Sequence, residues 1–308
     1  MITSVNIQPS MMMDAGFPVL GGLGLPADQP PARLKEVGTS SGLRPLLPSD
    51  ADAIHAVTCG LGLRMVYQPQ YDLTTRRIVS AEALLRWHHP QYGDVSPSVL
   101  IPMVNRLGLH MLLFNFIVTR VIDVLYCQRH FHPQMSIAVN ASIETLCTPE
   151  LAPLLANRMA RAGLSPRLLK IEMTEELPVL DELHLSACLH ALRAKGFPLS
   201  LDDFGAGSAT LNLLAKMPFD EVKIDGAFIR AMDSNPQSRA VVAAIIDMAQ
   251  LLKLKLIAEG IESEAMIASL LRMGCDTGQG YVLSRPMERD HFLRQQIGNA
   301  VVSRLNVK

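Results

Sequence analysis

Short strand-like runs alternate with longer helix-like segments from about residue 63 toward the carboxyl terminus. Eight runs have the apolar or alternating pattern of strands: 63–71, 76–87, 135–142, 168–175, 198–205, 221–229, 255–262 and 277–284. Between most of them lie segments with apolar residues every three or four positions, at 149–163, 181–196, 237–253 and 263–274. Several of these segments end at glycine, as helices commonly do. The pattern predicts a repeating strand–helix unit.

The order of these elements predicts a barrel. Only the segment 72–76, whose last residue also begins the second run, joins the first two strands. It is too short for a parallel crossover, so these strands should form an antiparallel hairpin. The later strands mostly have a helix between them, which suits parallel pairing. The predicted fold class is α/β, a TIM-like (β/α)8 barrel with one antiparallel strand. A short helix within 48–60, capped by Ser49 or Asp50, should begin the folded unit.

Three regions follow from the change of composition along the chain. Residues 1–46 are rich in Pro, Gly and Ser and show no sustained period, so we expect a flexible extension there. Residues 47–300 should form the folded domain, and residues 301–308 a short tail. Nothing in the first region is long or regular enough to predict a second domain.

Composition and charge exclude several classes of function. The 308 residues are 49% hydrophobic and 19% charged, which predicts a globular protein with a large core. The formal net charge is −1 and no basic stripe is present, so we expect no binding to polymeric nucleic acid. The longest apolar segments contain Arg120 and Asp123, or Asp247 and Lys253, and we therefore expect no membrane insertion.

The five cysteines indicate a reducing compartment. They are Cys59, Cys127, Cys147, Cys188 and Cys275, and no two of them form a CxxC pair. An odd number at wide spacing argues against a disulfide framework and against a zinc knuckle. We expect the protein to be cytoplasmic.

Polar residues recur at the ends of the predicted strands, where parallel barrels place their chemistry. Each one alone has an ordinary interpretation: Asp202 and Asp203, for example, precede Gly205 and could be turn or helix-cap residues. Their recurrence within apolar runs favours a shared site, because a charge facing the barrel interior is costly unless it is compensated. The residues are Glu82, Asn140, Glu172, Asp202, Asp203, Lys223, Asp225, Glu259 and Gln279.

If these side chains converge, five carboxylates face essentially one lysine. Divalent cations are the natural compensation, and oxygen ligands without Cys or His favour Mg²⁺ or Mn²⁺ over zinc. Two such ions are a common device for phosphodiester hydrolysis. Arg86, four residues after Glu82, is placed to pair with a phosphate. Metal-assisted phosphoester cleavage is the predicted reaction class.

The same residues lie in eight ordered motifs. The chain resembles the EAL-domain cyclic di-GMP phosphodiesterases of bacteria over about residues 49–298. The motifs are YQP at 67–69, EALLRW at 82–87, VNAS at 139–142, EMTE at 172–175, DDFGAG at 202–207, KID at 223–225, EGIE at 259–262 and QGY at 279–281.

The resemblance implies hydrolysis of cyclic di-GMP to linear pGpG with Mg²⁺ or Mn²⁺, and homodimers are frequent in the family. Lys223 would hold and polarise the attacking water. The other implied catalytic residues are Glu82, Asp202 and Glu259. Glu175 would anchor the loop after DDFG. The implied metal ligands are Glu82, Asn140, Glu172, Asp202 and Asp203, with Glu259 close to the metal-bound water; the implied substrate contacts are Gln68, Leu84, Arg86, Asp225 and Gln279.

One departure from the family leaves other functions open. Ser208 stands where family members often have an aromatic residue after the DDFG loop, which puts the rate and its regulation in question more than the chemistry. A catalytically weak receptor for cyclic di-GMP, or a protein-interaction module of the same fold, is the main alternative. An unrelated metal-dependent barrel enzyme acting on another phosphoester is a third, because fold alone does not fix a substrate.

Overall fold

The computed structural model describes residues 47–174, 181–205 and 211–296, all within one unit of the chain, 45–308. The predicted extension at 1–46 and the tail at 301–308 lie outside the described residues, so the proposed domain boundaries stay predictions.

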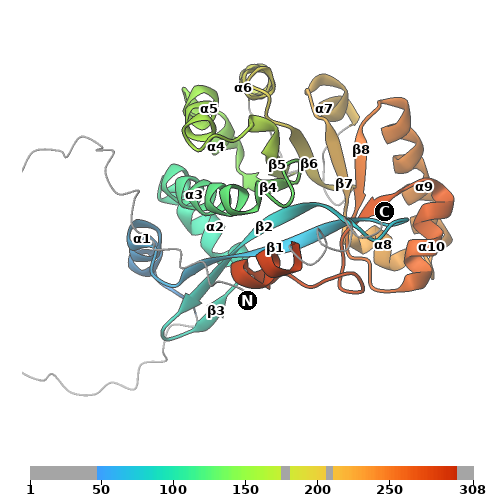
Figure 1. The fold of residues 1–308 in the computed structure, drawn as a ribbon, viewed down its shortest axis with the longest axis horizontal. Coiled ribbons are helices and arrows are strands. Elements are labelled where there is room, and N and C mark those ends of the chain that lie inside the picture. Colours follow the sequence, from blue (N-terminus) through green and yellow to red (C-terminus); the bar gives the residue numbers. More distant parts are fainter. Residues whose placement is uncertain (1–46, 175–180, 206–210, 297–308) are drawn as a thin grey trace, which may run out of the picture. The chain divides into compact units, whose positions relative to one another are not determined.

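Eight strands close into a barrel with helices around its outside (Figure 1). β1 pairs with β2 and with β9, both antiparallel, and the strands from β2 through β4 to β9 pair in parallel. The predicted TIM-like barrel with one antiparallel strand is confirmed. The barrel strands are β1 (Leu63–Asp72), β2 (Ile78–His89), β4 (Ser136–Ala141), β5 (Leu169–Thr174), β6 (Leu199–Phe204), β7 (Glu221–Ile224), β8 (Lys255–Ala258) and β9 (Thr277–Gly278).

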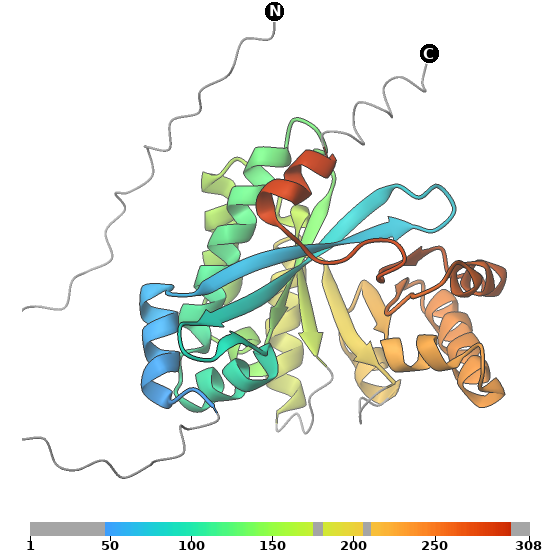
Figure 2. The ribbon, with the colours of Figure 1, turned by 90° about the horizontal axis from the view of Figure 1, so that it is seen from below.

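The first two strands form the hairpin that their short connection predicts. β1 and β2 pair from Leu63 opposite Trp87 to Tyr71 opposite Ile78, and Figure 2 shows them running together across one side of the barrel. Two short strands extend the sheet beyond the barrel: β3 (Gly93–Val95) pairs with β2, and β10 (Met287–Glu288) pairs with β1.

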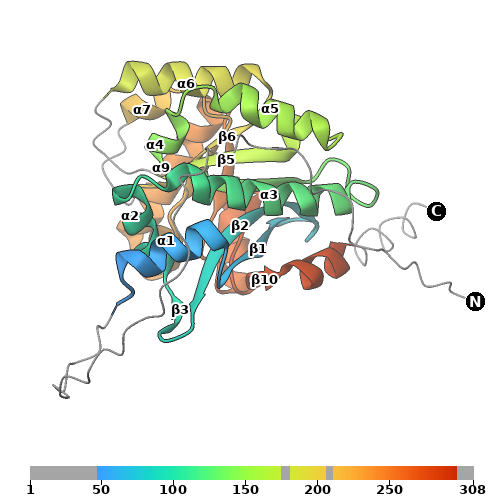
Figure 3. The same cartoon turned by 90° about the vertical axis from the view of Figure 1, so that its left-hand side faces the viewer.

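Helices cover the strands from outside (Figure 3). α1 begins where the sequence predicts, because Ser49 caps it: the Ser49 side chain accepts from Asp52 N, and Ser49 N donates to Asp52 Oδ2. The helices are α1 (Asp50–Cys59), α2 (Pro97–Arg106), α3 (His110–Gln128), α4 (Ile143–Leu146), α5 (Leu151–Arg161), α6 (Glu182–Ala194), α7 (Leu211–Lys216), α8 (Gly226–Ala231), α9 (Pro236–Leu251) and α10 (Glu264–Met273), with a 3₁₀ turn at Pro166–Leu168.

Three predicted strands are much shorter than their apolar runs. The run at 255–262 pairs only over Lys255–Ala258. The run at 221–229 leaves the sheet after Ile224, because the Asp225 side chain accepts a hydrogen bond from Ala227 N and starts α8. In the run at 277–284, only Thr277–Gly278 pairs as a strand. Apolar composition therefore located all three strands but extended them too far.

Among the described residues, α3 alone is long and apolar enough to span a membrane by length and composition, with a mean hydropathy of 1.5. It packs on β2 and β4 as a barrel helix does. Its buried residues recur every three or four positions, from Leu113 and Phe114 to Leu125 and Gln128, which is the pattern of a helix with one face on a core.

Candidate active site

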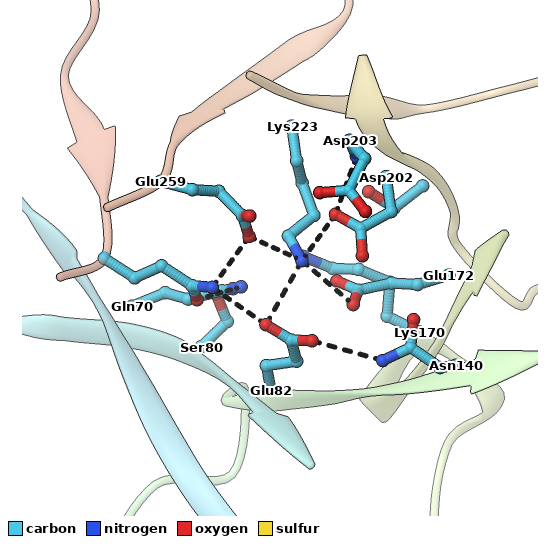
Figure 4. Close-up of polar contacts among 12 residues, drawn as sticks. Gln70, Ser80, Glu82, Asn140, Lys170, Glu172, Asp202, Asp203, Lys223 and Glu259 are labelled. Atoms are coloured by element: carbon cyan, nitrogen blue, oxygen red, sulfur yellow. Dashed lines mark hydrogen bonds and ion pairs between the residues drawn. The ribbon is translucent and has the colours of Figure 1, made fainter. Parts of the chain in front are cut away.

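A single buried lysine lies at the centre of a cluster of acids in the barrel. Lys223, on β7, is 1% exposed. Its Nζ lies 3.1 Å from Glu82 Oε2 and 3.2 Å from Glu172 Oε2. It also lies 2.9 Å from Asp202 Oδ1 and 2.7 Å from Glu259 Oε1. One ammonium group is thus shared by four carboxylates (Figure 4).

The strands bring these residues together from distant parts of the sequence. Asn140 on β4 lies beside Glu172 on β5, and Thr174 on β5 lies beside Asp202 on β6. Glu82 comes from β2 and Lys223 from β7, while Glu259 and Gln279 directly follow β8 and β9. The residues that the sequence places at strand ends therefore do meet.

The backbone at Asp203 explains how two successive aspartates face the same site. Asp203 has φ of 53°, in the left-handed region, and the pairing of β6 with β7 shifts register between Leu201 and Phe204. Aspartate tolerates this conformation better than most residues. Asp203 N donates to Asp202 Oδ1 over 3.0 Å. Asp202, Asp203 and Glu259 each place a carboxylate oxygen within 4.8 Å of the others.

A chain of hydrogen bonds through two side-chain amides and one hydroxyl fixes the carboxylates of Glu82 and Glu259. It lies on the side of the site formed by the β1–β2 hairpin. Gln279 Nε2 donates to Glu82 Oε2 over 2.8 Å and to Glu259 Oε1 over 2.7 Å. Gln70 Nε2 donates to Gln279 Oε1 over 3.1 Å, and Ser80 Oγ donates to Gln70 Oε1. The sequence analysis did not single out Gln70 or Ser80. Both lie two residues from a predicted site residue, Gln68 or Glu82, and so share its side of the strand.

Lys223 and Glu82 keep their charges. Burial alone would lower the pKa of Lys223, but the surrounding carboxylates of Asp202, Glu172, Glu259 and Glu82 raise it well above its ordinary value. Burial would raise the pKa of Glu82, but the Lys223 ammonium and hydrogen bonds from Gln279, Lys223 and Asn140 hold it below its ordinary value.

The other carboxylates hold their protons more tightly. Burial, together with neighbouring negative charge, raises the pKa of Glu172 and of Asp202 in spite of Lys223. Burial and Asp202 raise the pKa of Asp203 to about 6, and burial raises the pKa of Glu259 to about 8. One lysine therefore does not neutralise the cluster, and additional positive charge would favour its ionised form.

The ligand set fits hard divalent cations. Glu82, Glu172 and Asp202 place carboxylate oxygens within 4.8 Å of one another, and Asp202 belongs to the second such group with Asp203 and Glu259. Among the described residues, Glu172 Oε1 is buried and has no hydrogen-bond partner. An unpaired buried oxygen is costly. Oxygen donors of this kind suit Mg²⁺ or Mn²⁺, and the buried acidic cluster can bind a metal.

Three of the predicted substrate residues share one face of the β1–β2 pair with Glu82, and a fourth, Gln279, donates a hydrogen bond to Glu82. Gln68 is directly opposite Glu82 in the β1–β2 pair, and Leu84 and Arg86 continue the same face of β2, both partly exposed. Arg86 Nη1 donates to Leu85 O over 2.8 Å. Asp225 is engaged in capping α8, so one of its oxygens is already occupied. Glu175 and Ser208 lie outside the described residues.

A second buried lysine lies at the opposite, amino-terminal end of the strands. Lys170 Nζ is 2.6 Å from both carboxylate oxygens of Glu221, and Ser200 Oγ donates to Glu221 Oε1 over 3.0 Å. Lys170 and Glu221 border a cavity of about 1190 Å³ that contains none of the predicted site residues. The site is therefore located by its chemistry and not by this cavity.

Comparison with known proteins gives one consistent family. The sequence-family model of the EAL domain matches residues 55–286, which include every predicted site residue. The chain is 34% identical over 232 residues to the bifunctional diguanylate cyclase/cyclic di-GMP phosphodiesterase MucR of Pseudomonas aeruginosa, covering 74% of this chain and 33% of MucR. It is 31% identical over 247 residues to the cyclic di-GMP phosphodiesterase RocR of the same organism, covering 80% of this chain and 63% of RocR.

A solved structure gives the same result for the fold. A complex of the MucR phosphodiesterase with cyclic di-GMP superposes with a TM-score of 0.71 and 31% sequence identity, covering 79% of this chain and 99% of that one. The described barrel therefore has the arrangement of a structure that holds cyclic di-GMP.

Proposed function

This chain belongs to the EAL domain family, and we propose that it is a metal-dependent phosphodiesterase that hydrolyses cyclic di-GMP to linear pGpG. The observation that most supports the proposal is the sharing of Lys223 by four carboxylates from four parts of the barrel. A receptor needs to bind the nucleotide, but only hydrolysis needs this excess of metal-binding oxygens beside a buried ammonium group.

The similar proteins support the substrate. MucR and RocR carry the name of cyclic di-GMP phosphodiesterases, and a MucR structure holds cyclic di-GMP. The match spans only 33% of MucR and 63% of RocR, so the activity is transferred to this chain as a proposal. It rests on the part of the family that this chain shares.

We assign the metal ligands from the two groups of carboxylates. Glu82, Asn140, Glu172 and Asp202 would hold one cation, and Asp202, Asp203 and Glu259 a second. When bound, two divalent cations would supply the positive charge that activates water and stabilises the phosphate oxygens during displacement. The buried Glu172 Oε1 without a partner supports the first set, and the shared position of Asp202 supports a close pair.

Lys223 would orient the attacking water. Its ammonium group donates hydrogen bonds and keeps its charge among the carboxylates. Water would add to one phosphorus, the P–O3′ bond would break, and a proton from the water would pass to the leaving O3′. The ring opens to a single linear product, pGpG, with a 5′-phosphate at one end and a 3′-hydroxyl at the other. Glu82, Asp202 and Glu259 would position Lys223 and the water through their contacts with Nζ.

The hairpin side of the site would contact the substrate. Arg86 and Gln68 offer donors near Glu82, and Leu84 offers an apolar surface beside them. The planar guanidinium of Arg86 suits a phosphate. Gln279 and Asp225 are assigned as further contacts, although Asp225 also caps α8. The supporting role of Glu175 stays a prediction, since it lies outside the described residues.

Incubation with cyclic di-GMP and Mg²⁺ or Mn²⁺, followed by chromatography of the nucleotides, tests the proposal. We expect pGpG with the wild type, none with Glu82→Gln, and unchanged turnover with Asp247→Asn, a carboxylate exposed on α9. Retained binding of cyclic di-GMP without any product in the wild type would instead support a receptor. Neither binding nor product would contradict both functions.

Two further properties remain proposals. The five free cysteines support a reducing, cytoplasmic location. A homodimer is expected from the family alone, and sedimentation velocity at several protein concentrations would test it.

A further inference from the structure

The structure brings two cysteines and a histidine together outside the barrel site. Cys147 ends α4, while His184 and Cys188 lie on α6. The sulfur atoms of Cys147 and Cys188 and a ring nitrogen of His184 all lie within 4.8 Å of one another. Cys147 and Cys188 are 41 positions apart, so the lack of a CxxC pair hides this grouping in the sequence. We propose that Cys147, His184 and Cys188 form a binding site for Zn²⁺.

The local structure aims the three side chains at one point. His184 and Cys188 are four residues apart on α6 and therefore lie on the same face of the helix. α4 packs against α6, which places Cys147 opposite that face. The His184 backbone N–H is fixed by a hydrogen bond to Asp181 Oδ1, the cap of α6. The His184 backbone is thus held in the first turn of a capped helix, and Cys188 lies about one turn further along α6.

The separations suit tetrahedral zinc. Zn–S bonds of about 2.3 Å and Zn–N bonds of about 2.0–2.1 Å put sulfur and nitrogen about 3.6 Å apart at the tetrahedral angle. His184 Nε2 lies 3.8 Å from Cys188 Sγ. A small adjustment would bring both atoms to zinc-binding distance. Two thiolates and an imidazole are a common zinc ligand set, which leaves the fourth position for water or another ligand.

The electrostatic surroundings also favour a cation. The carboxylates of Asp181 and Glu144 contribute negative charge around Cys147. The same negative charge attracts a divalent ion. Zinc would displace the thiol protons, as metal binding to cysteine requires. A disulfide would use the two cysteines but would leave the position of His184 unexplained.

The bound ion would join two helices that follow neighbouring strands of the catalytic barrel. α4 begins after Ser142, two residues beyond Asn140 on β4, and α6 follows β5, which holds Glu172. We therefore expect Zn²⁺ to stabilise this side of the barrel without taking part in hydrolysis. This role is independent of the proposed phosphodiesterase activity.

Titration of the reduced, chelator-treated protein with Co²⁺ tests the site directly. Cobalt bound by thiolates has a charge-transfer absorption in the near ultraviolet that the oxygen ligands of the barrel cannot produce. We expect this band to saturate at one Co²⁺ per chain and to disappear when Zn²⁺ is added. Asp202→Asn should keep the band, which separates this site from the proposed catalytic one.

Matched variants locate the ligands. Cys147→Ser should abolish the band, whereas Cys59→Ser, at an exposed cysteine on α1, should keep it. His184→Ala changes an exposed side chain and should weaken Co²⁺ binding at least tenfold while circular dichroism remains unchanged. No band in the wild type, a band that survives Cys147→Ser, or a Cys147–Cys188 disulfide found by mass spectrometry without zinc uptake would overturn the proposal.

Discussion

Two buried lysines in one barrel have opposite surroundings. At the amino-terminal end of the strands, Lys170 meets one carboxylate, Glu221, with Ser200 as a further donor. At the other end, Lys223 is shared by the carboxylates of Glu82, Glu172, Asp202 and Glu259. We call Lys170 with Glu221 the lower pair, and Lys223 with its four carboxylates the upper cluster. The charges balance in the lower pair, whereas the upper cluster has an excess of negative charge.

The difference separates a structural contact from a site for ligands. A balanced, hydrogen-bonded pair satisfies both of its charges and needs no further partner. The upper cluster leaves excess negative charge and an unpaired Glu172 oxygen among the described residues. Such a cluster is stabilised by protons or by metal ions. We therefore assign a packing role to the lysine at one end and propose a chemical role for the lysine at the other.

Replacement of the two lysines should have different effects, on turnover at one end of the barrel and on stability at the other. Lys223→Met removes the group that orients water, and we expect cyclic di-GMP turnover to fall about 10³-fold, as for the loss of one preorganised donor at a reaction centre. The change of kcat, measured by chromatography of pGpG, checks this. A loss smaller than tenfold, with folding intact, would contradict the role of Lys223.

The matching change at the lower end should affect stability. Lys170→Met leaves Glu221 buried without its partner, and we expect unfolding in urea to become easier by about 3–5 kcal/mol. The double variant Lys170→Met with Glu221→Gln removes both charges and should recover most of this loss. Turnover by the double variant should stay within about threefold of the wild type, because that end of the barrel takes no part in the chemistry. Equal loss of turnover in the double variant and in Lys223→Met would remove the distinction between the two ends.

Metal ions should stabilise the upper cluster and not the lower pair. At a Mg²⁺ concentration 100 times the dissociation constant, we expect the free energy of unfolding to rise by about 2.7 kcal/mol per bound ion. The double variant at Lys170 and Glu221 should show the same gain, whereas Asp202→Asn should lose most of it. Thermal denaturation with and without Mg²⁺ measures the difference. A gain retained in full by Asp202→Asn would place the ion elsewhere.

The hydrogen-bonded chain behind Gln279 should have a smaller effect. Gln70→Leu removes the donor to Gln279 Oε1 and frees the amide that holds Glu82 and Glu259. We expect kcat to fall about tenfold, as for residues that orient metal ligands. The apparent affinity for Mn²⁺ should weaken with it, while Asp247→Asn leaves both unchanged. A loss of stability alone, with normal kcat and Mn²⁺ affinity, would make Gln70 a packing residue.

The smallest expected effect is the change in the free energy of unfolding per pH unit. In the metal-free protein, the pKa of Glu259 is raised from its ordinary value of 4.5 to about 8, and that of Asp203 from 3.8 to about 6. The folded state then binds more protons than the unfolded state, so its extra stability is complete below about pH 4 and is lost as pH rises to about 8. Each group contributes a slope of at most about 1.4 kcal/mol per pH unit.

Thermal denaturation of chelator-treated protein across this pH range measures the slope, and Mg²⁺ should reduce it. Glu259→Gln should reduce the slope between about pH 5 and about pH 8. A metal-free protein whose stability rises from pH 6 to pH 8 would contradict the shifts in the cluster.

The upper cluster was easier to predict from the sequence than the lower pair because its residues lie at the carboxyl ends of strands, where parallel barrels place their chemistry. Side chains two residues apart share a face of a strand. Lys170 lies two residues before Glu172, Ser200 two before Asp202, and Glu221 two before Lys223. The lower layer could therefore have been predicted by stepping back two positions along each strand.

Other features depend on tertiary packing and have no comparable signal. The meeting of Cys147 with Cys188 requires the contact between α4 and α6, which no local pattern specifies. The early end of β7 depends on the Asp225 cap, which competes with an apolar run that otherwise favours a longer strand. The convergence of Asp202 and Asp203 depends on the positive φ of Asp203.

The claim that the carboxylates around Lys223 bind a pair of divalent ions is tested by counting bound Mn²⁺ with electron paramagnetic resonance of the free ion. Manganese suits this test because it prefers the oxygen ligands of the barrel to the thiols outside it. We expect about two ions per chain in the wild type and in the double variant at Lys170 and Glu221. Since Asp202 belongs to both groups of carboxylates, Asp202→Asn should lose both ions. Absence of Mn²⁺ binding in the wild type with cyclic di-GMP present, or equal uptake by Asp202→Asn, would contradict the claim.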